Sequence, residues 1–254
     1  MHTRFVLALL ILFPVSLATQ AESSDSTKLK TSLSVSGFLQ DGNVETTILR
    51  INSDLIYKPW KKWVFNTRNS YVYQEFWQVK ADEDFLSLNF IYFNSDKKIY
   101  PQLLGFVSTN FRRRIDLRYL VGGGITYRLI DKKRNTLRIS ISSEFEKTVF
   151  NQTNFNRDRY DNSSSINTFR ATLWAKGQYA LFKKKVIFSH ENYFQPSLTL
   201  DDNFRWQADM SVEFPIWSFL NFRINYRHTH ESIVIQDQEE EDRILTFGFT
   251  IKNF

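Results

Sequence analysis

Apolar and polar side chains alternate along most of this chain, in segment after segment from about residue 31 to the end. The segment 204–214 shows the alternation most clearly. One face consists of Phe204, Trp206, Ala208, Met210, Val212 and Phe214. The other face consists of Arg205, Gln207, Asp209, Ser211 and Glu213. Because successive side chains of a strand point to opposite sides of a sheet, this pattern predicts a strand with one apolar and one charged face.

About twelve segments read as strands of this kind, which predicts an all-β fold of one domain. A strand that crosses a bilayer at a tilt needs about 9–11 residues, and most of the segments reach that length. The chain therefore predicts an antiparallel transmembrane barrel. The predicted strands cover residues 31–40, 45–57, 63–74, 85–93, 100–111, 117–129, 137–146, 167–179, 186–194, 204–214 and 220–229, and a closing strand with Leu245, Phe247, Phe249 and Ile251.

The more apolar face of each strand is predicted to face lipid, and the more polar face the lumen. In the segment 85–93 this rule places Leu86, Leu88, Phe90 and Tyr92 on the lipid side. The segment 100–111 is harder to orient, because its two faces differ little. A soluble β-sandwich or ligand-binding barrel is the alternative, and it predicts shorter strands of about five or six residues with polar outer faces.

The connections between the strands alternate in length. Bacterial outer-membrane barrels have short periplasmic turns and longer outer loops, so an even number of strands places both termini in the periplasm. The first hairpin, at Asp41-Gly42-Asn43, is short although it lies on the outer side. The short, lysine-rich connections are 58–62, 94–98, 131–135, 182–185 and 215–218. The longer connections are 76–84, 112–116, 147–165, 195–202 and 231–242.

Aromatic side chains gather at the short-turn ends of the strands. Rings with a polar handle settle at the head-group level of a bilayer and form a girdle there. A soluble sandwich offers no reason for this bias toward one end. The predicted interface aromatics are Tyr57, Trp60, Trp63, Tyr92, Tyr100, Tyr127, Tyr179, Phe182, Phe214, Trp217 and Phe219.

The first 21 residues have the pattern of a secretory signal peptide. Arg4 supplies the positive charge, an apolar run follows, and small residues lead to a predicted cleavage site after Ala21. The apolar run is shorter than the roughly 20 residues of a spanning helix. Residues 22–30 are then a periplasmic segment, and residues 31–254 are the barrel. The chain has no cysteine, which excludes a lipoprotein anchor and a disulfide framework.

The composition is basic, with 33 Lys and Arg against 27 Asp and Glu and a formal net charge of +6. A basic chain suggests nucleic acid as a partner. However, arginines in the interiors of strands present no continuous basic face, so nucleic-acid binding is not expected. The mean hydropathy of −0.37 is unlike that of a helical membrane protein but agrees with a barrel, in which half of each strand stays polar.

The opening hairpin, residues 33–47, has a start rich in Gly, Asn and Thr, and the middle of the chain carries Gly122-Gly123-Gly124 and Tyr127-Arg128. In these segments the chain resembles the salt-induced outer-membrane proteins, a bacterial family of uncharacterised function. The resemblance implies an outer-membrane barrel and names no substrate. Two features depart from that pattern: the chain is basic, and Lys252 and Asn253 interrupt the alternation before Phe254. The terminal Phe254 resembles the signal read by barrel-assembly machinery, which implies that machinery and periplasmic chaperones as partners.

The predicted inward faces carry more cations than anions, and two interpretations follow. An excess of cations biases a water-filled pore toward anions. Alternatively, the charges pair across the lumen and close it, since unpaired charges in a narrow space are costly. The cations are Arg50, Arg68, Arg118, Arg128, Arg138, Arg170, Lys176, Arg205, Arg223 and Arg227. The anions are Asp54, Glu144, Glu146, Glu191, Asp209 and Glu213.

No catalytic centre or cofactor is expected. A lipase needs a Ser–His pair, but Ser189 and His190 are neighbours on a strand and point to opposite faces. The pair His228 and His230 shares one face and is a weak metal-site candidate, with Glu239, Glu240 and Glu241 nearby in sequence. The parity of His228 places it on the lipid side, which favours an interfacial histidine over a metal ligand.

The predicted outer loops carry two charge runs, Arg112-Arg113-Arg114 and Glu239-Glu240-Glu241. They either contact lipopolysaccharide phosphates and bridging divalent ions or remain solvated loop charges. The sequence as a whole therefore predicts an outer-membrane barrel that forms a small passive pore with slight anion preference for small solutes. The resemblance adds a link to envelope or salt stress. The alternative is a closed structural barrel that acts through its outer loops, by surface binding or lipopolysaccharide contact.

Overall fold

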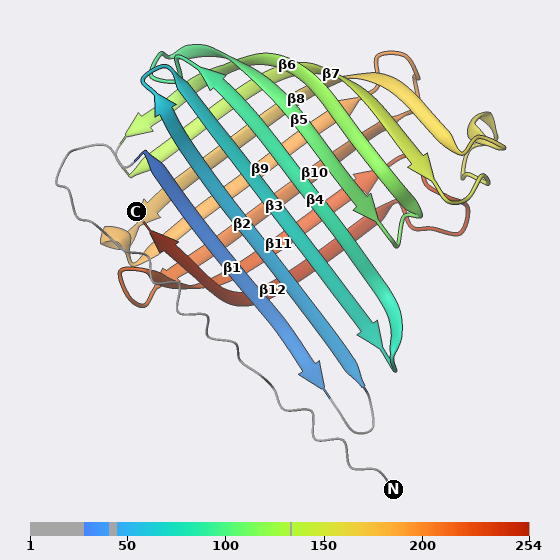
Figure 1. The fold of residues 1–254 in the computed structure, drawn as a ribbon, viewed down its shortest axis with the longest axis horizontal. Coiled ribbons are helices and arrows are strands. Elements are labelled where there is room, and N and C mark those ends of the chain that lie inside the picture. The colour runs from blue at the N-terminus through green and yellow to red at the C-terminus, as the bar shows by residue number, and fades with distance from the viewer. Residues whose placement is uncertain (1–27, 41–44, 133, 254) are drawn as a thin grey trace, which may run out of the picture.

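The structure, a computed structural model, describes residues 28–40, 45–132 and 134–253. The predicted signal peptide, the Asp41-Gly42-Asn43 turn and Phe254 lie outside these residues. Twelve antiparallel strands form a closed barrel in which each strand pairs with its neighbours in sequence and β1 pairs with β12 (Figure 1). The strands are β1 Leu29–Gln40, β2 Thr46–Trp60, β3 Trp63–Phe76, β4 Val79–Phe93, β5 Ile99–Asn110, β6 Ile115–Lys132, β7 Asn135–Phe150, β8 Ser165–Leu181, β9 Val186–Pro196, β10 Phe204–Pro215, β11 Leu220–Glu231 and β12 Glu241–Asn253.

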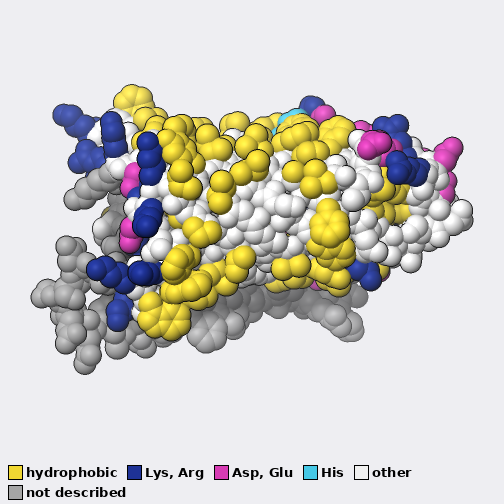
Figure 2. All heavy atoms as spheres, turned by 90° about the horizontal axis from the view of Figure 1, so that it is seen from above, with side chains coloured by type: hydrophobic (Ala, Val, Ile, Leu, Met, Phe, Trp, Pro, Cys, Tyr) yellow, Lys and Arg dark blue, Asp and Glu magenta, His cyan; other side chains and the backbone are white. Residues whose placement is uncertain are grey.

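The predicted fold class and strand number are confirmed by this topology. Along β7 the burial alternates as the sequence pattern requires: Ser140, Ser142 and Glu144 are buried, whereas Ile139 and Ile141 are exposed. Figure 2 shows apolar side chains spread over the outer wall, with charged side chains gathered at its two ends. An apolar outer band between charged rims is the surface of a barrel embedded in a bilayer. Among the described residues, no helix has the length and hydropathy needed to cross a membrane.

The two ends of the barrel differ in their connections. The short-turn end holds the starts of β1, β3, β5, β7, β9 and β11 and the end of β12, and the long-loop end lies opposite. Three long connections, 151–164, 197–203 and 232–240, are at the long-loop end. The predicted long connection at 76–84 is wrong, because β3 and β4 continue toward each other and leave only Trp77 and Gln78 between them. Both have positive φ, 49° and 60°, as a tight type I′ hairpin turn requires.

The orientation of β4 is the reverse of the prediction. Leu88 and Phe90 are 7% and 4% exposed and pack in the lumen with Leu104 and Trp174. Tyr92, on the same face, lies edge-on to buried Tyr100 and therefore faces the lumen, not the lipid interface as predicted. The prediction failed because it assumed a polar lumen, whereas this lumen contains an apolar cluster.

The polar face of β4 consequently turns outward. Asn89 accepts a hydrogen bond from Thr67 Oγ1 at 2.9 Å and donates one from Nδ2 to Ser87 Oγ at 3.0 Å. A polar group in lipid needs a partner within the protein, and these three side chains provide it for one another. This mutual hydrogen bonding allows the polar face of β4 to lie outside.

Two glycines allow β6 and β7 to approach closely. A Cβ on Gly122 would lie 2.1 Å from Ser143 O, and one on Gly124 would lie 2.1 Å from Ile141 O. Both obstacles are backbone atoms of the neighbouring strand, which a rotamer change cannot move. By contrast, a Cβ on Gly105 would meet nothing within 4 Å.

We therefore expect Gly124→Ala to destabilise the barrel by about 2 kcal/mol or more, because the added methyl group forces β6 and β7 apart. Gly105→Ala is the matched control and should refold like the parent chain. Heat-modifiable mobility on gel electrophoresis after refolding into vesicles measures the folded fraction. Equal refolding of the two variants would show that the close approach is not needed.

Candidate functional site

The lumen is the candidate site, and an ion pair between opposite walls crosses it. Arg68 on β3 binds Glu191 on β9 through two hydrogen bonds, and these strands lie six apart in the ring of twelve. Glu191 also accepts a hydrogen bond from Trp174 Nε1 at 2.9 Å and lies 3.3 Å from Lys176 Nζ. Asp54 lies 3.9 Å from Arg68. Sequence alone placed Arg68, Glu191 and Lys176 on inward faces, and the structure brings them into one contact.

An apolar contact also crosses the lumen beside this ion pair. The rings of Phe90 on β4 and Trp174 on β8 meet edge to face with centroids 5.6 Å apart. Tyr193 on β9 packs against Trp174 at 5.1 Å. Trp174 was not among the predicted lumen residues, although it shares the parity of Arg170 and Lys176 and is therefore at an inward position. The two transverse contacts together reduce the free cross-section of the lumen.

A second charge cluster lies nearer the long-loop end, centred on Glu146, which is 1% exposed. Arg170 donates to it from Nε and Nη2 at 2.9 and 3.1 Å, and Arg205 Nη2 donates at 2.5 Å. Arg118 lies 4.0 Å from Glu146 and binds Glu231 on β11 at 2.7 and 2.6 Å. These contacts join β6, β7, β8, β10 and β11, so the cluster braces half of the wall. We call it the Glu146 cluster.

The remaining lumen acids have different partners. Glu144 is 1% exposed and accepts hydrogen bonds from the hydroxyl groups of Ser142 and Thr172. Asp209 binds Arg227 at 2.7 Å. Glu213 accepts a hydrogen bond from Asn221 Nδ2 at 2.7 Å. Most of the lumen charge is therefore paired, in agreement with the second of the two interpretations of the lumen.

Three cations nevertheless stand side by side on adjacent strands toward the short-turn end. The register pairs Arg128 on β6 with Arg138 on β7, and Arg138 with Lys176 on β8. Arg128 contacts Asp131 and the carbonyl of Ser95, and Lys176 contacts Glu191. Arg138 has no ion pair with any described residue. We call these three residues the cation row. Like charges directly opposite each other on neighbouring strands repel, so the row favours an anion beside it.

Two further inward arginines, Arg50 on β2 and Arg223 on β11, have no ion pair within the described part of the chain. Arg50 shares a cavity of 20 Å³ with residues of β3, β11 and β12.

Two arginines of the predicted outer loops form ion pairs within the protein. The sequence predicted that they either contact lipopolysaccharide or remain solvated. Arg112 binds Asp82 and Asp242 at 3.0 and 3.1 Å, and Arg113 binds Asp242 at 2.8 Å. These two arginines thus use their charge within the protein.

The long loops cover the Glu146 cluster with a small apolar core. Phe155 in the loop 151–164 forms a β-bridge with Ile235 in the loop 232–240, and Tyr160 and Ile233 pack with them. Tyr160 Oη donates a hydrogen bond to Asp202 Oδ1 at 2.8 Å. Burial and this carboxylate raise the pKa of Tyr160 to about 12. We call this assembly the loop lid.

The predicted metal-site histidines lie on the outer face among aromatic rings. His228 contacts Trp206, with centroids 4.6 Å apart, and His230 stacks on Phe204 at 5.2 Å. His228 Nε2 lies 3.2 Å from Glu241, and His230 Nε2 lies 3.9 Å from Glu240. No group of three or more metal-binding side chains occurs within the described ranges. His190 stacks on Tyr179, away from Ser189, whose side chain has the opposite parity.

Most of the predicted interface aromatics lie near the short-turn end and outside the apolar contacts of the lumen. Tyr92 and Tyr100 are the exceptions. Tyr100 is 1% exposed and belongs to the lumen. The exposed members are Tyr57, Trp60, Trp63, Phe182, Phe214, Trp217 and Phe219. Tyr127 receives a cation–π contact from Lys98, and Tyr179 stacks with Phe188.

Residues 33–252 match the model of a family described as a protein of unknown function, DUF481. The chain belongs to this family. No curated protein matches the sequence. The link to salt-induced proteins stays a prediction, because the DUF481 description contains no such term.

Solved structures similar to this DUF481 chain are bacterial barrels with very different sequences. The NanC porin is 8% identical, and the match covers 88% of this chain and 100% of that one with a TM-score of 0.52. The translocator domain of the autotransporter NalP from Neisseria meningitidis is 10% identical, with coverages of 91% and 90% and a TM-score of 0.45. The Vibrio cholerae OmpT is 7% identical, with coverages of 91% and 100% and a TM-score of 0.41. At these identities, the NanC likeness supports the barrel fold alone.

We expect Glu146→Gln to destabilise the barrel by about 3–5 kcal/mol, because it leaves Arg170 and Arg205 buried without their counter-charge. Glu144→Gln is the control, because Glu144 is equally buried but its partners are hydroxyl groups. The amide oxygen of Gln still accepts a hydrogen bond from one hydroxyl group and its NH₂ donates to the other, so the loss should be about 1 kcal/mol. Urea unfolding in vesicles, followed by tryptophan fluorescence, measures both. A similar loss in the two variants would contradict a special role for the Glu146 cluster.

We expect Tyr160→Phe to open the loop lid about tenfold more often, because it removes a hydrogen bond to a carboxylate. The rate of tryptic cleavage after Arg157 and Arg159 measures this opening, with Tyr57→Phe at the far end of the barrel as control. A raised pKa means that the folded lid favours the protonated phenol. Its stabilisation is therefore complete below pH 10 and is lost as the pH rises toward about 12. Unchanged cleavage in Tyr160→Phe would contradict this role of the hydroxyl group.

Proposed function

We propose that this protein is a bacterial outer-membrane barrel that provides a narrow passage for small anionic solutes. Its short-turn end faces the periplasm, and its loop lid faces outward. The apolar outer band, the aromatic residues at the short-turn end and the family membership support this proposal, together with the likeness of the fold to a porin. No catalytic step is part of it.

The observation that carries the proposal is the cation row. Arg128, Arg138 and Lys176 occupy neighbouring strands about 4.8 Å apart, and Arg138 has no acidic partner among the described residues. The side chain of Lys176 is 42% exposed, so water reaches the row. A solvated row of cations raises the local concentration of anions and lowers that of cations.

The transverse contacts support a narrow passage instead of a wide one. The ion pair of Arg68 with Glu191 and the contact of Phe90 with Trp174 divide the lumen. On the β4–β8 side, Leu104, Tyr100 and Thr126 are at most 3% exposed, so that side is filled. On the other side, several inward positions of β1 and β12 carry short polar residues, among them Ser32, Ser34 and Thr250. Solutes would pass the cation row at the short-turn end and continue along that side toward the long-loop end.

A closed barrel that acts through its loops is the second candidate function. The burial of Glu144, Glu146, Thr172 and Arg170 to 3% exposure or less favours it, because an open pore would wet such residues. The loop lid would then present the binding surface, with lipopolysaccharide or another surface ligand as partner. A measurement of ion conductance across a bilayer distinguishes the narrow passage from the closed barrel.

We expect the refolded chain to give small, discrete conductance steps with anion preference in a planar bilayer. Arg138→Ser should lower the chloride-to-potassium permeability ratio about tenfold, because one charge at about 6 Å in water changes the local anion and cation concentrations about threefold each, in opposite directions. Lys147→Ser removes the same charge from the outward face of β7 and should leave the ratio unchanged. Arg170 is unsuitable for this test, because its loss disrupts the Glu146 cluster.

Three results would count against the passage. A heat-modifiable barrel without conductance steps would favour the closed barrel. Equal ratios for the parent chain and Arg138→Ser would exclude the cation row as the source of selectivity. A similar change in Lys147→Ser would attribute the effect to net charge and not to the lumen.

A further inference from the structure

A small cavity in the lumen brings two arginines together beside the strands that close the barrel. Arg50 on β2 and Arg227 on β11 both line it, together with residues of β3 and β12. In the ring of strands, β2 and β11 are separated by β1 and β12. Arg227 is the charged group that acts most strongly on Arg50. Two like charges beside one cavity repel each other, so the place favours an anion between them. We call it the Arg50 cavity.

Both arginines have donors that no described residue uses. Arg50 forms no ion pair within the described part of the chain, and its Nε atom is buried without a hydrogen-bond partner there. A buried donor without a partner is costly and calls for an explanation. Arg227 donates from Nε to Asp209 at 2.7 Å, and Asn225 Nδ2 donates to the other oxygen of Asp209 at 2.7 Å. The two Nη groups of Arg227 have no hydrogen bond to a described residue, so they are available to a ligand.

The acids on β4 do not neutralise Arg50 by direct contact. Asp82 and Asp84 both act on Arg50, but less strongly than Arg227 does. Val72 lies between Arg50 and Asp84 in the register, which separates their strands by about 10 Å. Asp82 binds Arg112 at 3.0 Å, and Asp84 accepts a hydrogen bond from the backbone of the β5–β6 turn at 2.8 Å. These two acids therefore have partners of their own.

The other polar groups that line the Arg50 cavity are neutral. Asn52 and Ser70 are opposite each other in the β2–β3 register, and neither side chain has a hydrogen bond to another described residue. Thr246 lines the cavity from β12. No carboxylate is among the residues that line it. Hydroxyl and amide donors beside two guanidinium groups form a set that suits an anion.

The size of the cavity limits which anion fits. Its volume is 20 Å³. About 10–15 Å³ is enough for one water molecule, so the cavity holds a single ion of roughly that size. A chloride ion meets this limit. Phosphate, with four oxygen atoms, and organic acids, with a carbon chain, do not.

We propose that the Arg50 cavity binds a chloride ion between the guanidinium groups of Arg50 and Arg227. The ion offsets their repulsion and accepts hydrogen bonds from their free N–H groups and from the side chains of Asn52 and Ser70. This site is separate from the cation row. It does not rest on conduction through the lumen, because a closed barrel would hold the same ion.

A chloride ion at this place would strengthen the part of the ring that has the fewest strand contacts. Among the described residues, five register pairs join β1 to β12, whereas β4 and β5, the next least paired neighbours, share seven. The ion contacts β2 on one side of this pair of strands and β11 on the other. It therefore links the two strands that flank the closure.

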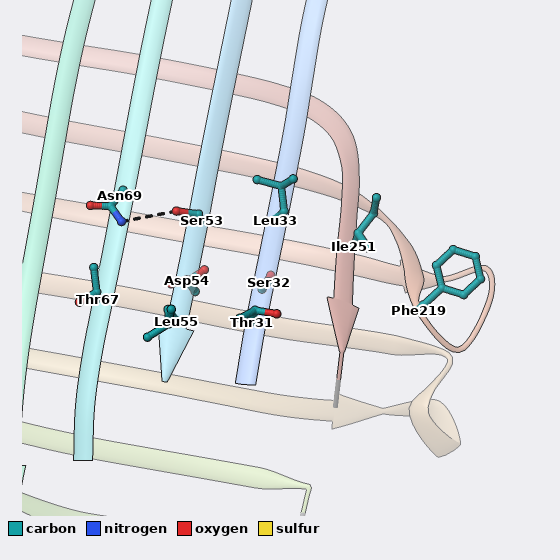
Figure 3. A pocket seen from close by; sticks show the side chains of 10 residues that line it. All are labelled: Thr31, Ser32, Leu33, Ser53, Asp54, Leu55, Thr67, Asn69, Phe219 and Ile251. Atoms are coloured by element: carbon teal, nitrogen blue, oxygen red, sulfur yellow. Dashed lines mark hydrogen bonds between the residues drawn. The ribbon is translucent and has the colours of Figure 1, made fainter. Parts of the chain in front are cut away.

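A larger groove beside the same strands is unsuited to an anion. It has a volume of 520 Å³ and is lined by exposed apolar side chains, among them Leu33, Leu55, Phe219 and Ile251 (Figure 3). Asp54 is the one charged residue among those that line it. A carboxylate repels chloride, so the groove serves as an internal control for the location of the ion.

The first test follows thermal unfolding of the refolded full chain in neutral detergent, in sodium chloride and in sodium gluconate of equal ionic strength. Gluconate is too large for the cavity, so the difference between the salts separates chloride binding from screening. Chloride should raise the unfolding temperature along a saturation curve, by about 5–10 °C at a hundredfold excess over its dissociation constant.

Three variants locate this response. Arg50→Gln should weaken chloride binding about tenfold, because it removes a charge-assisted contact. Arg138→Gln is the matched control: it removes another lumen arginine without an ion pair to a described residue, and it should keep the full response. Ser70→Leu keeps both arginines but fills the cavity, so it should lose the response. A purely structural role of Arg50 would instead lower the unfolding temperature of Arg50→Gln equally in both salts.

The second test locates the ion directly. Bromide is close to chloride in size, and its anomalous scattering identifies it in a crystal. With bromide at the concentration that gives half of the thermal response, we expect a peak between Arg50 and Arg227. Crystals of Arg50→Gln should lack this peak, and the groove of Figure 3 should contain none in either protein.

Several outcomes would overturn the proposal. An equal rise in chloride and gluconate would show general screening. A full response to chloride in Arg50→Gln or Ser70→Leu would exclude the cavity, and its loss in Arg138→Gln would assign the ion to the cation row. Bromide found only outside the Arg50 cavity would indicate an adventitious ion. None of these readouts uses conductance, so failure of the proposed passage would leave them unaffected.

Discussion

The lumen of this barrel is organised by the need to pair charges where water is excluded. An isolated charge in such a place costs several kcal/mol, and the cost is offset only when a counter-charge and hydrogen bonds have good geometry. Glu146 meets this condition with Arg170 and Arg205, and Glu191 meets it with Arg68. Each of these acids binds a side chain from a non-adjacent strand. These ion pairs therefore hold distant parts of the barrel wall together, and their side chains fill the part of the lumen that they cross.

The bracing divides the barrel into two unlike halves. From β4 to β8 the interior holds apolar rings, buried hydroxyl groups and the Glu146 cluster, and the loop lid covers that side. On β1 and β12 several inward side chains are short, such as Ser32, Ser34 and Thr250, and cannot reach across. The cation row lies outside this bracing and borders the solvated short-turn end.

Much of this architecture could be predicted from the sequence, because a two-residue period reports strands and faces directly. Eleven strand ranges were predicted, and ten of them agree with the strands of Figure 1 within four residues, whereas β4 begins six residues earlier than predicted. The face of β4 was predicted wrongly, because Leu88 and Phe90 fill the lumen while Asn89 and Ser87 satisfy each other outside. Alternation shows that two faces differ, but not which one faces lipid. The pairing of Arg68 with Glu191, 123 positions away, depends on how the ring closes, and no local pattern encodes it.

The incomplete pairing of β1 with β12 follows from the same competition for partners. Five residue pairs join the two strands, from Thr31 with Asn253 to Val35 with Phe249, and beyond Val35 β1 pairs only with β2. Continued pairing of β1 with β12 would place Gly37 opposite Phe247 and Leu39 opposite Leu245, which matches apolar positions on the lipid side, so the register itself does not prevent closure. What opposes closure is Asp242, whose carboxylate binds Arg112 and Arg113 at the β5–β6 turn. Arg112 also binds Asp82, which is 1% exposed, so the β5–β6 turn is itself anchored to β4. The hydrogen bonds that β1 and β12 do not form with each other are thus set against charge-assisted contacts at the rim.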